Sequence, residues 1–215
     1  MRLVIFDLDG TLIHASSERL FARYLQARGC LGWPQMLAFA TFVARYGLLY
    51  RGAVFKKDKG YLAGLPRARV DELAQRFVDD ELVRTLYRPA QTRLERHVAN
   101  GDLVLLLTGT PDFIAQPLAT RLGLKHVIAT DCRMRNGVFT SAPPRRHPLG
   151  TDKLRCAQEF AAQHAVNLGQ AVAYANARED RFLLANVGEA VAVRPDLRLR
   201  GLARRAGWEI LEART

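Results

Sequence analysis

The sequence predicts an α/β protein whose three-layer core contains a mostly parallel sheet. Short, continuous apolar runs recur along the chain, as in strands buried on both faces, and segments with helical spacing separate them. The expected strands lie near residues 2–7, 102–108, 126–129, 170–174 and 190–193. Residues 14–85 show only helical patterns, so we expect a helical cap at 14–85, inserted after the first strand into a core formed by residues 1–13 and 86–215.

Length and composition agree with one core and one cap. The chain has 215 residues, of which 49% are hydrophobic and 25% are charged, as is typical of a globular protein. Its three cysteines are scattered, so neither a disulfide framework nor a zinc site is expected. Only Met1 and Arg2 precede the first expected strand, which leaves no room for a secretory signal and favours a cytoplasmic location.

A formal net charge of +11 would suit a nucleic-acid or anionic-membrane partner. The charge is spread along the chain, however, because residues 14–85 hold 12 Lys or Arg and 7 Asp or Glu, a surplus of 5 that leaves 6 positive charges elsewhere. The sequence also lacks a recognisable nucleic-acid-binding module. We therefore expect a generally basic surface that attracts phosphate substrates, and we do not expect nucleic-acid binding.

The first expected strand ends in the most informative stretch of the chain, residues 4–12 (Val-Ile-Phe-Asp-Leu-Asp-Gly-Thr-Leu). Asp7 and Asp9 are two residues apart, so in extended backbone their side chains leave the same side of the chain. Crowded carboxylates repel each other unless a cation lies between them or one of them holds a proton. Gly10 permits a tight turn after them, and the Thr11 hydroxyl can bond to backbone groups that the turn leaves free.

A second apolar strand also ends in small polar residues, at 103–111 (Leu-Val-Leu-Leu-Leu-Thr-Gly-Thr-Pro). Thr108 and Gly109 come just before a helix that begins at Pro111. A hydroxyl and successive backbone N–H groups at a helix N-terminus bind phosphate oxygens well. The stretch therefore indicates a phosphate-binding turn, and an ordinary strand-to-helix turn is the alternative.

Two later stretches add polar side chains near helix and strand ends. Lys153 lies at the start of a helix near residue 151 and is one of five lysines in a chain with 27 arginines. Asn176 and Asp180 follow the expected strand near 170–174. Open α/β sheets bind their ligands at the carboxyl ends of their strands, so the polar residues after the three strands are expected at one site.

Phe-Asp-Leu-Asp-Gly-Thr-Leu resembles the first motif of the haloacid-dehalogenase-like superfamily, whose members mostly move phosphoryl groups through an aspartyl-phosphate. The resemblance implies a Rossmann-like core and a phosphatase in which Asp7 is the nucleophile and Asp9 the acid/base. Thr108 matches the phosphate-binding hydroxyl of the second motif. Lys153 matches the lysine that bridges the nucleophile and the phosphoryl oxygens.

The stretch 171–180 resembles the Tyr-Gly-Asp-Ser-x-x-Asp pattern of the phosphoserine-phosphatase-like branch. Asn176 stands where that branch has an Asp that binds magnesium, whereas Asp180 keeps the second acid. An amide oxygen still ligates a hard cation but brings no charge, so we expect weaker metal binding and keep a catalytically weak regulatory or binding relative as an alternative. The implied Mg²⁺ ligands are Asp7, Asp9, Asn176 and Asp180, and the implied phosphate-binding residues are Gly10, Thr108, Gly109 and Lys153.

An uncharged segment, residues 29–44, follows the first expected helix of the cap at 16–28, whose expected N-cap is Ser16. Apolar residues surround the expected helix in this segment instead of forming a stripe along it. The segment is too short and interrupted for a membrane span, so it forms either the interior of the cap or a surface that contacts lipid. A basic cluster follows that is either a solvated face or a substrate contact, comprising Arg51, Lys56, Lys57 and Lys59.

The cap also bears on the substrate. Phosphoserine phosphatases of the resembled branch hold the amino acid with a Glu and an Arg, and the nearest alignments to these residues are Ser16 and Asp58. The cap instead resembles that of phosphatidylglycerophosphate phosphatases, so we expect an apolar or lipid-like phosphomonoester and peripheral contact with the inner face of a membrane. A small-metabolite phosphatase is the alternative. His126 and His147 have no partner at ligand spacing and are expected outside the site.

Overall fold

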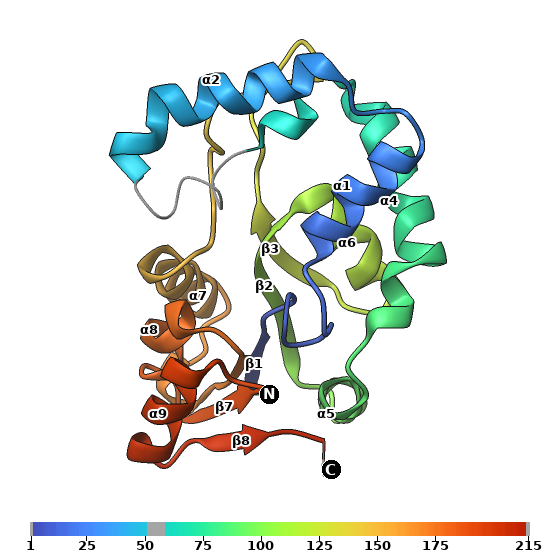
Figure 1. Ribbon diagram of the computed structural model, residues 1–215. Helices are drawn as coiled ribbons and strands as arrows, with labels where there is room; N and C mark the ends of the chain where they lie inside the picture. Colours follow the sequence, from blue (N-terminus) through green and yellow to red (C-terminus); the bar gives the residue numbers. More distant parts are fainter. Residues whose placement is uncertain (1, 51–58, 214–215) are drawn as a thin grey trace.

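The computed structural model describes residues 2–50 and 59–213, and the core is a six-stranded parallel sheet with helices on both faces (Figure 1). The strand order is β3-β2-β1-β6-β7-β8, so the first strand of the chain lies inside the sheet. The expected three-layer α/β fold is confirmed, with all five expected strands present and one strand added at an edge. The strands are β1 (Leu3–Phe6), β2 (Leu103–Pro111), β3 (His126–Thr130), β6 (Val172–Ala175), β7 (Glu189–Val193) and β8 (Glu209–Leu211).

The three layers follow from the alternation of side chains along each strand. Val4 and Phe6 belong to one apolar cluster, which includes residues of α5 (Arg88–Ala99) and α6 (Asp112–Arg121). Leu3 and Ile5 belong to a second cluster on the other face. That face is covered by α7 (Thr151–Gln163), α8 (Arg181–Leu184) and α9 (Leu197–Ala206). Because both faces are buried, every residue of β1 is apolar.

The regular elements in the described part of the chain between β1 and α5 are all helical. This part contains α1 (Ser17–Ala27), α2 (Trp33–Tyr50), η2 (Gly60–Leu62), α4 (Arg67–Asp80) and η3 (Leu82–Thr85). Short elements elsewhere are the hairpin strands β4 (Met134–Arg135) and β5 (Val138–Phe139) and the turns η4 (Leu168–Gln170) and η5 (Arg178–Asp180). Figure 1 shows α2 extended across the end of the molecule, beyond α1 and α4.

The insertion shares its hydrophobic core with the sheet domain. Phe21 of α1 lies 5.3 Å from Phe77 of α4 and 5.5 Å from Phe113 of α6, measured between ring centroids. All three rings are buried in the cluster that also holds Val4 and Phe6. The apolar core therefore continues across the two boundaries that the sequence predicts, at residues 14 and 85.

The first turns of α2 are largely exposed, so of the two alternatives for this segment, the interior of the cap does not describe them. Trp33 and Met36 are 72% and 74% exposed, whereas Phe42 further along the helix is buried. Within the described residues, no helix has the length and apolar character needed to span a bilayer.

The basic cluster expected after α2 is described only at Lys59. This side chain is 2% exposed, and its Nζ donates to both carboxylate oxygens of Glu18, at 2.7 and 2.6 Å. The interpretation of Lys59 as part of a solvated face is therefore wrong. Arg51, Lys56 and Lys57, like the aligned position Asp58, lie outside the described residues.

Candidate active site

Asp7 follows β1 directly and is held at the carboxyl end of the sheet. Its backbone N–H donates to the carbonyl of Tyr174 on β6, at 2.9 Å, which continues the ladder between the two strands. Gly10 then turns the chain with a φ of +77°, and a Cβ at this position would lie 2.0 Å from the Asn176 side-chain nitrogen. Both the left-handed backbone and the close approach of Asn176 require glycine here.

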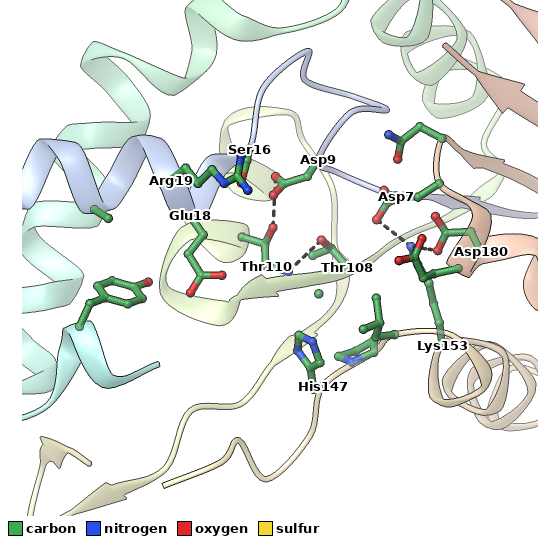
Figure 2. A pocket seen from close by; sticks show the side chains of 18 residues that line it. Asp7, Asp9, Ser16, Glu18, Arg19, Thr108, Thr110, His147, Lys153 and Asp180 are labelled. Carbon is green, nitrogen blue, oxygen red and sulfur yellow. Dashed lines mark hydrogen bonds and ion pairs between the residues drawn. The ribbon is translucent and has the colours of Figure 1, made fainter. Parts of the chain in front are cut away.

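Lys153 joins two of the predicted acidic residues. Its Nζ donates to Oδ1 of Asp7 and to Oδ1 of Asp180, each at 2.7 Å, and all three side chains are buried (Figure 2). Lys153 comes from the first turn of α7, while Asp180 ends η5 after β6. The structure thus brings together Asp7 and Lys153, which are 146 positions apart in the sequence.

The pKa of Asp7 is raised to about 6, chiefly because burial disfavours the charged carboxylate. The Lys153 ammonium opposes this shift, whereas the negative charges of Asp180 and Asp9 add to it. Burial also lowers the pKa of Lys153, but the two carboxylates outweigh this effect and raise that pKa overall. Lys153 is therefore a permanent cation, and a further cation beside Asp7 would favour ionisation of its carboxyl group.

The end of β2 supplies hydroxyl and N–H groups to the same site. The backbone N–H of Thr110 donates to Oγ1 of Thr108 at 3.1 Å, so the Thr108 hydroxyl hydrogen remains available to another acceptor. The pairing of β2 with β3 shifts register between Leu107 and Pro111, which breaks the regular ladder around these residues. Such irregular backbone at a strand end leaves N–H groups that can bind phosphate oxygens.

The carboxylate of Asp9 is directed toward the insertion. Its Oδ1 accepts hydrogen bonds from the backbone N–H of Ser17 at 3.1 Å and from the Thr110 hydroxyl at 3.3 Å. Ser16 occupies the N-cap position of α1, but its side chain makes no capping bond, so Asp9 caps the helix in its place. Burial raises the pKa of Asp9, against the lowering effect of these hydrogen bonds.

The oxygen atoms expected to hold Mg²⁺ fit a hard cation. The Thr11 hydroxyl lies 3.3 Å from Oδ2 of Asp7 and 3.5 Å from Oδ1 of Asn176, which shows that these two oxygens converge. In the part of the chain that the structure describes, no three His, Cys, Asp or Glu side chains form a group that could hold a metal ion. The ligand set that the sequence predicts, Asp7, Asp9, Asn176 and Asp180, therefore includes an amide oxygen, from Asn176, beside its carboxylates. All four assignments stay predictions.

These residues line a pocket of about 600 Å³. The insertion contributes Ser16, Glu18, Arg19, Ala22 and Tyr61, and the loop before α7 contributes His147, Pro148 and Leu149. Gly109 and all the other predicted site residues except Gly10 are also among its lining residues. The pocket is thus lined both by residues at the strand ends and by residues of the expected insertion.

Sequence reasoning missed two features of this pocket. Glu18 lines it while bound to the buried Lys59, and these residues are 41 positions apart. His147 also lines it, so the expectation that this histidine lies outside the site is wrong (Figure 2). The Thr130 hydroxyl donates to the Gly109 carbonyl at 2.6 Å and is 2.7 Å from Nδ1 of His147, which holds the ring beside the end of β2.

The comparison with protein families agrees with these motifs. A family model described as haloacid dehalogenase-like hydrolase matches residues 4–185. The chain belongs to this family. The resemblance inferred from the four motifs is thereby confirmed for most of the chain, including the insertion between β1 and β2.

Individual relatives of this haloacid dehalogenase-like hydrolase cover nearly its whole length. Phosphoserine phosphatase SerB1 of Mycobacterium tuberculosis (strain ATCC 25618 / H37Rv) is 32% identical, over 97% of this chain and 70% of that protein. A histidinol-phosphatase of Neisseria meningitidis serogroup C (strain 8013) is 27% identical, over 97% of each chain. A solved structure of a Bordetella pertussis Tohama I protein with unknown function matches with a TM-score of 0.83 and 27% identity, over 98% of each chain.

Proposed function

We propose that this phosphatase of the haloacid dehalogenase-like family is a Mg²⁺-dependent phosphomonoesterase that forms an aspartyl-phosphate on Asp7 and acts on small polar substrates. The observation that carries the proposal is the buried group formed by Asp7, Lys153 and Asp180 at the base of the 600 Å³ pocket. A carboxylate held beside a cation, with hydroxyl and N–H groups opposite, suits the transfer of a phosphoryl group.

In the proposed first step, a carboxylate oxygen of Asp7 attacks phosphorus while the bond from phosphorus to the ester oxygen breaks. Asp9 gives its proton to the departing alkoxide. In the second step, Asp9 takes a proton from water as that water attacks phosphorus, which releases phosphate and restores the Asp7 carboxylate. Thr108 donates its free hydroxyl hydrogen to a phosphoryl oxygen, and Lys153 balances the charge of the phosphoryl group throughout.

Phosphatases of this family generally use Mg²⁺. When bound, the ion would neutralise charge on the phosphoryl oxygens. Asp7, Asn176 and Asp180 would hold it, because their oxygens border the pocket and suit a hard cation. The intact nucleophile and lysine favour this reading over that of a catalytically weak relative.

Phosphate release from a panel of phosphomonoesters, with Mg²⁺ and after chelation, tests the proposed activity. We expect turnover with Mg²⁺ and loss of turnover on chelation that added Mg²⁺ restores. Rapid quenching during turnover should also trap phosphate bound covalently to the protein through Asp7. Turnover that is unaffected by chelation, or that proceeds without a phosphoprotein, would contradict the proposal.

The cap side of the pocket supports a small polar leaving group. Arg19 offers a positive charge there, Glu18 lines the pocket with its carboxylate paired to Lys59, and Tyr61 adds an aromatic face. No described residue of α2 lines this pocket, so the apolar segment does not form the wall that a lipid-like substrate would use. We therefore expect amine-bearing phosphomonoesters, such as phosphoserine and histidinol phosphate, to be hydrolysed with higher kcat/KM than a long-chain alkyl phosphate. A kcat/KM that is tenfold higher for the long-chain alkyl phosphate than for the amine-bearing substrates would contradict this proposal.

A lipid-like substrate presented at a membrane is the second candidate, and the exposed start of α2 favours it. Trp33 and Met36 are apolar and mostly exposed, and the net charge of +11 would be attracted to an anionic surface. Flotation with vesicles that contain anionic lipid tests this candidate. Under it, Trp33→Ser with Met36→Ser should abolish binding, whereas Leu197→Ser, at an exposed position on α9, should not. Absence of parent binding would eliminate the membrane contact.

A further inference from the structure

A hydrogen-bonded ring joins the first residue of α1 to the carboxylate of Asp9. Ser17 takes part twice, because its backbone N–H donates to Oδ1 of Asp9 at 3.1 Å and its hydroxyl lies 2.9 Å from that of Thr110. The Thr110 hydroxyl completes the ring by donating to the same Oδ1 at 3.3 Å. Both Ser17 and Thr110 are buried, so water does not replace these contacts.

The direction of the hydrogen bonds follows from the number of protons. A hydroxyl has one hydrogen, and the Thr110 hydroxyl spends it on the Asp9 carboxylate. It therefore accepts from the Ser17 hydroxyl, which becomes the donor in that contact. Ser17 thus reaches Oδ1 of Asp9 in two ways. Its backbone N–H donates directly to this oxygen, and its hydroxyl donates to the Thr110 hydroxyl, which donates to the same oxygen.

We infer that Ser17 and Thr110 are positioning residues for the acid/base Asp9. The hydrogen bonds from the Ser17 N–H and from the Thr110 hydroxyl both end on Oδ1 of Asp9, so the inference assigns Oδ2 as the oxygen that faces the leaving group. Since Ser17 begins α1, the acid is aligned when the insertion is seated on the end of β2. This inference rests on the proposed function, and it concerns only the step in which the alkoxide is protonated.

Substrates with different leaving groups can show whether Ser17 and Thr110 position Asp9 or only support the structure of the pocket. An alkoxide leaves poorly unless it receives a proton, so the hydrolysis of an alkyl phosphate depends on the alignment of Asp9. The 4-nitrophenolate anion leaves without protonation, so 4-nitrophenyl phosphate bypasses that requirement. A misaligned acid therefore slows the first reaction much more than the second, whereas a damaged pocket slows both.

The experiment compares kcat for an alkyl phosphate and for 4-nitrophenyl phosphate in Thr110→Val and Ser17→Ala, with Mg²⁺ present. For Thr110→Val we expect about a tenfold or greater fall in kcat on the alkyl phosphate and less than about a threefold fall on 4-nitrophenyl phosphate, with KM nearly unchanged. Ser17→Ala keeps the main-chain N–H, so its loss should be smaller. Thr110→Ser should restore most of the rate, and Thr92→Val, at an exposed position on α5, is the matched control.

The inference would be overturned if kcat fell equally on the two substrates in both variants. It would also be overturned if both variants kept the parent's ratio of kcat on the alkyl phosphate to kcat on 4-nitrophenyl phosphate. If Thr110→Val does not fold, as judged by its thermal unfolding, the smaller changes Ser17→Ala and Thr110→Ser carry the comparison. A parent enzyme that hydrolyses neither substrate would refute the proposed function itself. That result is distinct from the failure of positioning, in which the parent is active and the ratio does not change.

Discussion

Asp7 lies buried beside Lys153, with the charges of Asp180 and Asp9 nearby. Replacement by Asn keeps the shape of the side chain and removes the nucleophile. We predict that Asp7→Asn lowers kcat by about 10³-fold or more while leaving the circular dichroism spectrum unchanged. Asp152→Asn, on the exposed side of α7, should keep the parent's rate. Retention of a tenth of the parent's rate in Asp7→Asn would rule out the covalent route.

Asn176 carries an uncharged amide at a position where we expect a ligand of Mg²⁺ and where the resembled motif has an Asp. We predict that Asn176→Asp lowers the Mg²⁺ concentration needed for half-maximal activity, by about tenfold, because a carboxylate binds a hard cation more strongly than an amide. Calorimetric titration of the free enzyme should show the same change. Asn167→Asp, at the N-cap of η4, is the control and should leave the metal dependence as it is. Identical titrations for Asn176→Asp and the parent would place Asn176 outside the metal shell.

The residues of the site differ in how far the sequence could reveal them. Asp7, Asp9 and Thr108 stand at the ends of apolar runs, so their convergence follows from the geometry of a parallel sheet. The pair formed by Lys59 and Glu18 could not be foreseen, because neither residue has a local signature and only the fold brings them together. A lysine in a basic run looks solvated until its distant partner is known.

At the scale of elements, α1 is fixed by aromatic packing. Phe21 is fully buried and contacts rings from α4 and α6. We predict that Phe21→Ala lowers the free energy of unfolding by about 3–5 kcal/mol in urea denaturation, since it removes a large buried side chain and leaves a cavity. Val98→Ala, at an exposed position on α5, should change this energy by less than about 0.5 kcal/mol. A small effect of Phe21→Ala would mean that the insertion repacks readily.

Some elements were predictable and others were not. The strands β1 and β2 are continuous apolar runs, which the sequence distinguishes clearly from helices. The edge strand β8 has only three residues and begins with Glu209, so no run marks it. It forms because β7 offers an unpaired edge, and Ile210 pairs with Ala192 there. A helix was predictable within residues 29–44, but α2 (Trp33–Tyr50) begins later and continues further, and its exposure depends on the neighbours that the fold supplies.

For the molecule as a whole, the site makes stability depend on pH. Asp7 has a pKa of about 6 in the folded protein and 3.8 as the ordinary value, so the folded state binds this proton more tightly. The stability that this provides is fully present below pH 3.8 and is lost as the pH rises through 6. We predict that metal-free Asp7→Asn gains on the order of 2 kcal/mol in stability relative to the parent between pH 4 and pH 7.

Thermal unfolding of the parent and of Asp7→Asn across this pH range provides the measurement, because the other titrating groups contribute similarly to both proteins. Added Mg²⁺ should stabilise the parent at pH 7 and reduce the difference. A difference between the two proteins that stays constant from pH 4 to pH 7 would show that Asp7 carries no elevated pKa in the fold.

The shared aromatic core has a consequence for engineering by exchange of parts. Phe113, which packs on Phe21, belongs to α6 and not to the insertion. A chimera that received only the insertion of this chain would keep the contact of Phe21 with Phe77 but lose its contact with Phe113. One that lost only the insertion would expose Phe113 to water. Grafts between such enzymes should therefore transfer α6 together with the insertion, so that Phe21 and Phe113 stay packed on each other.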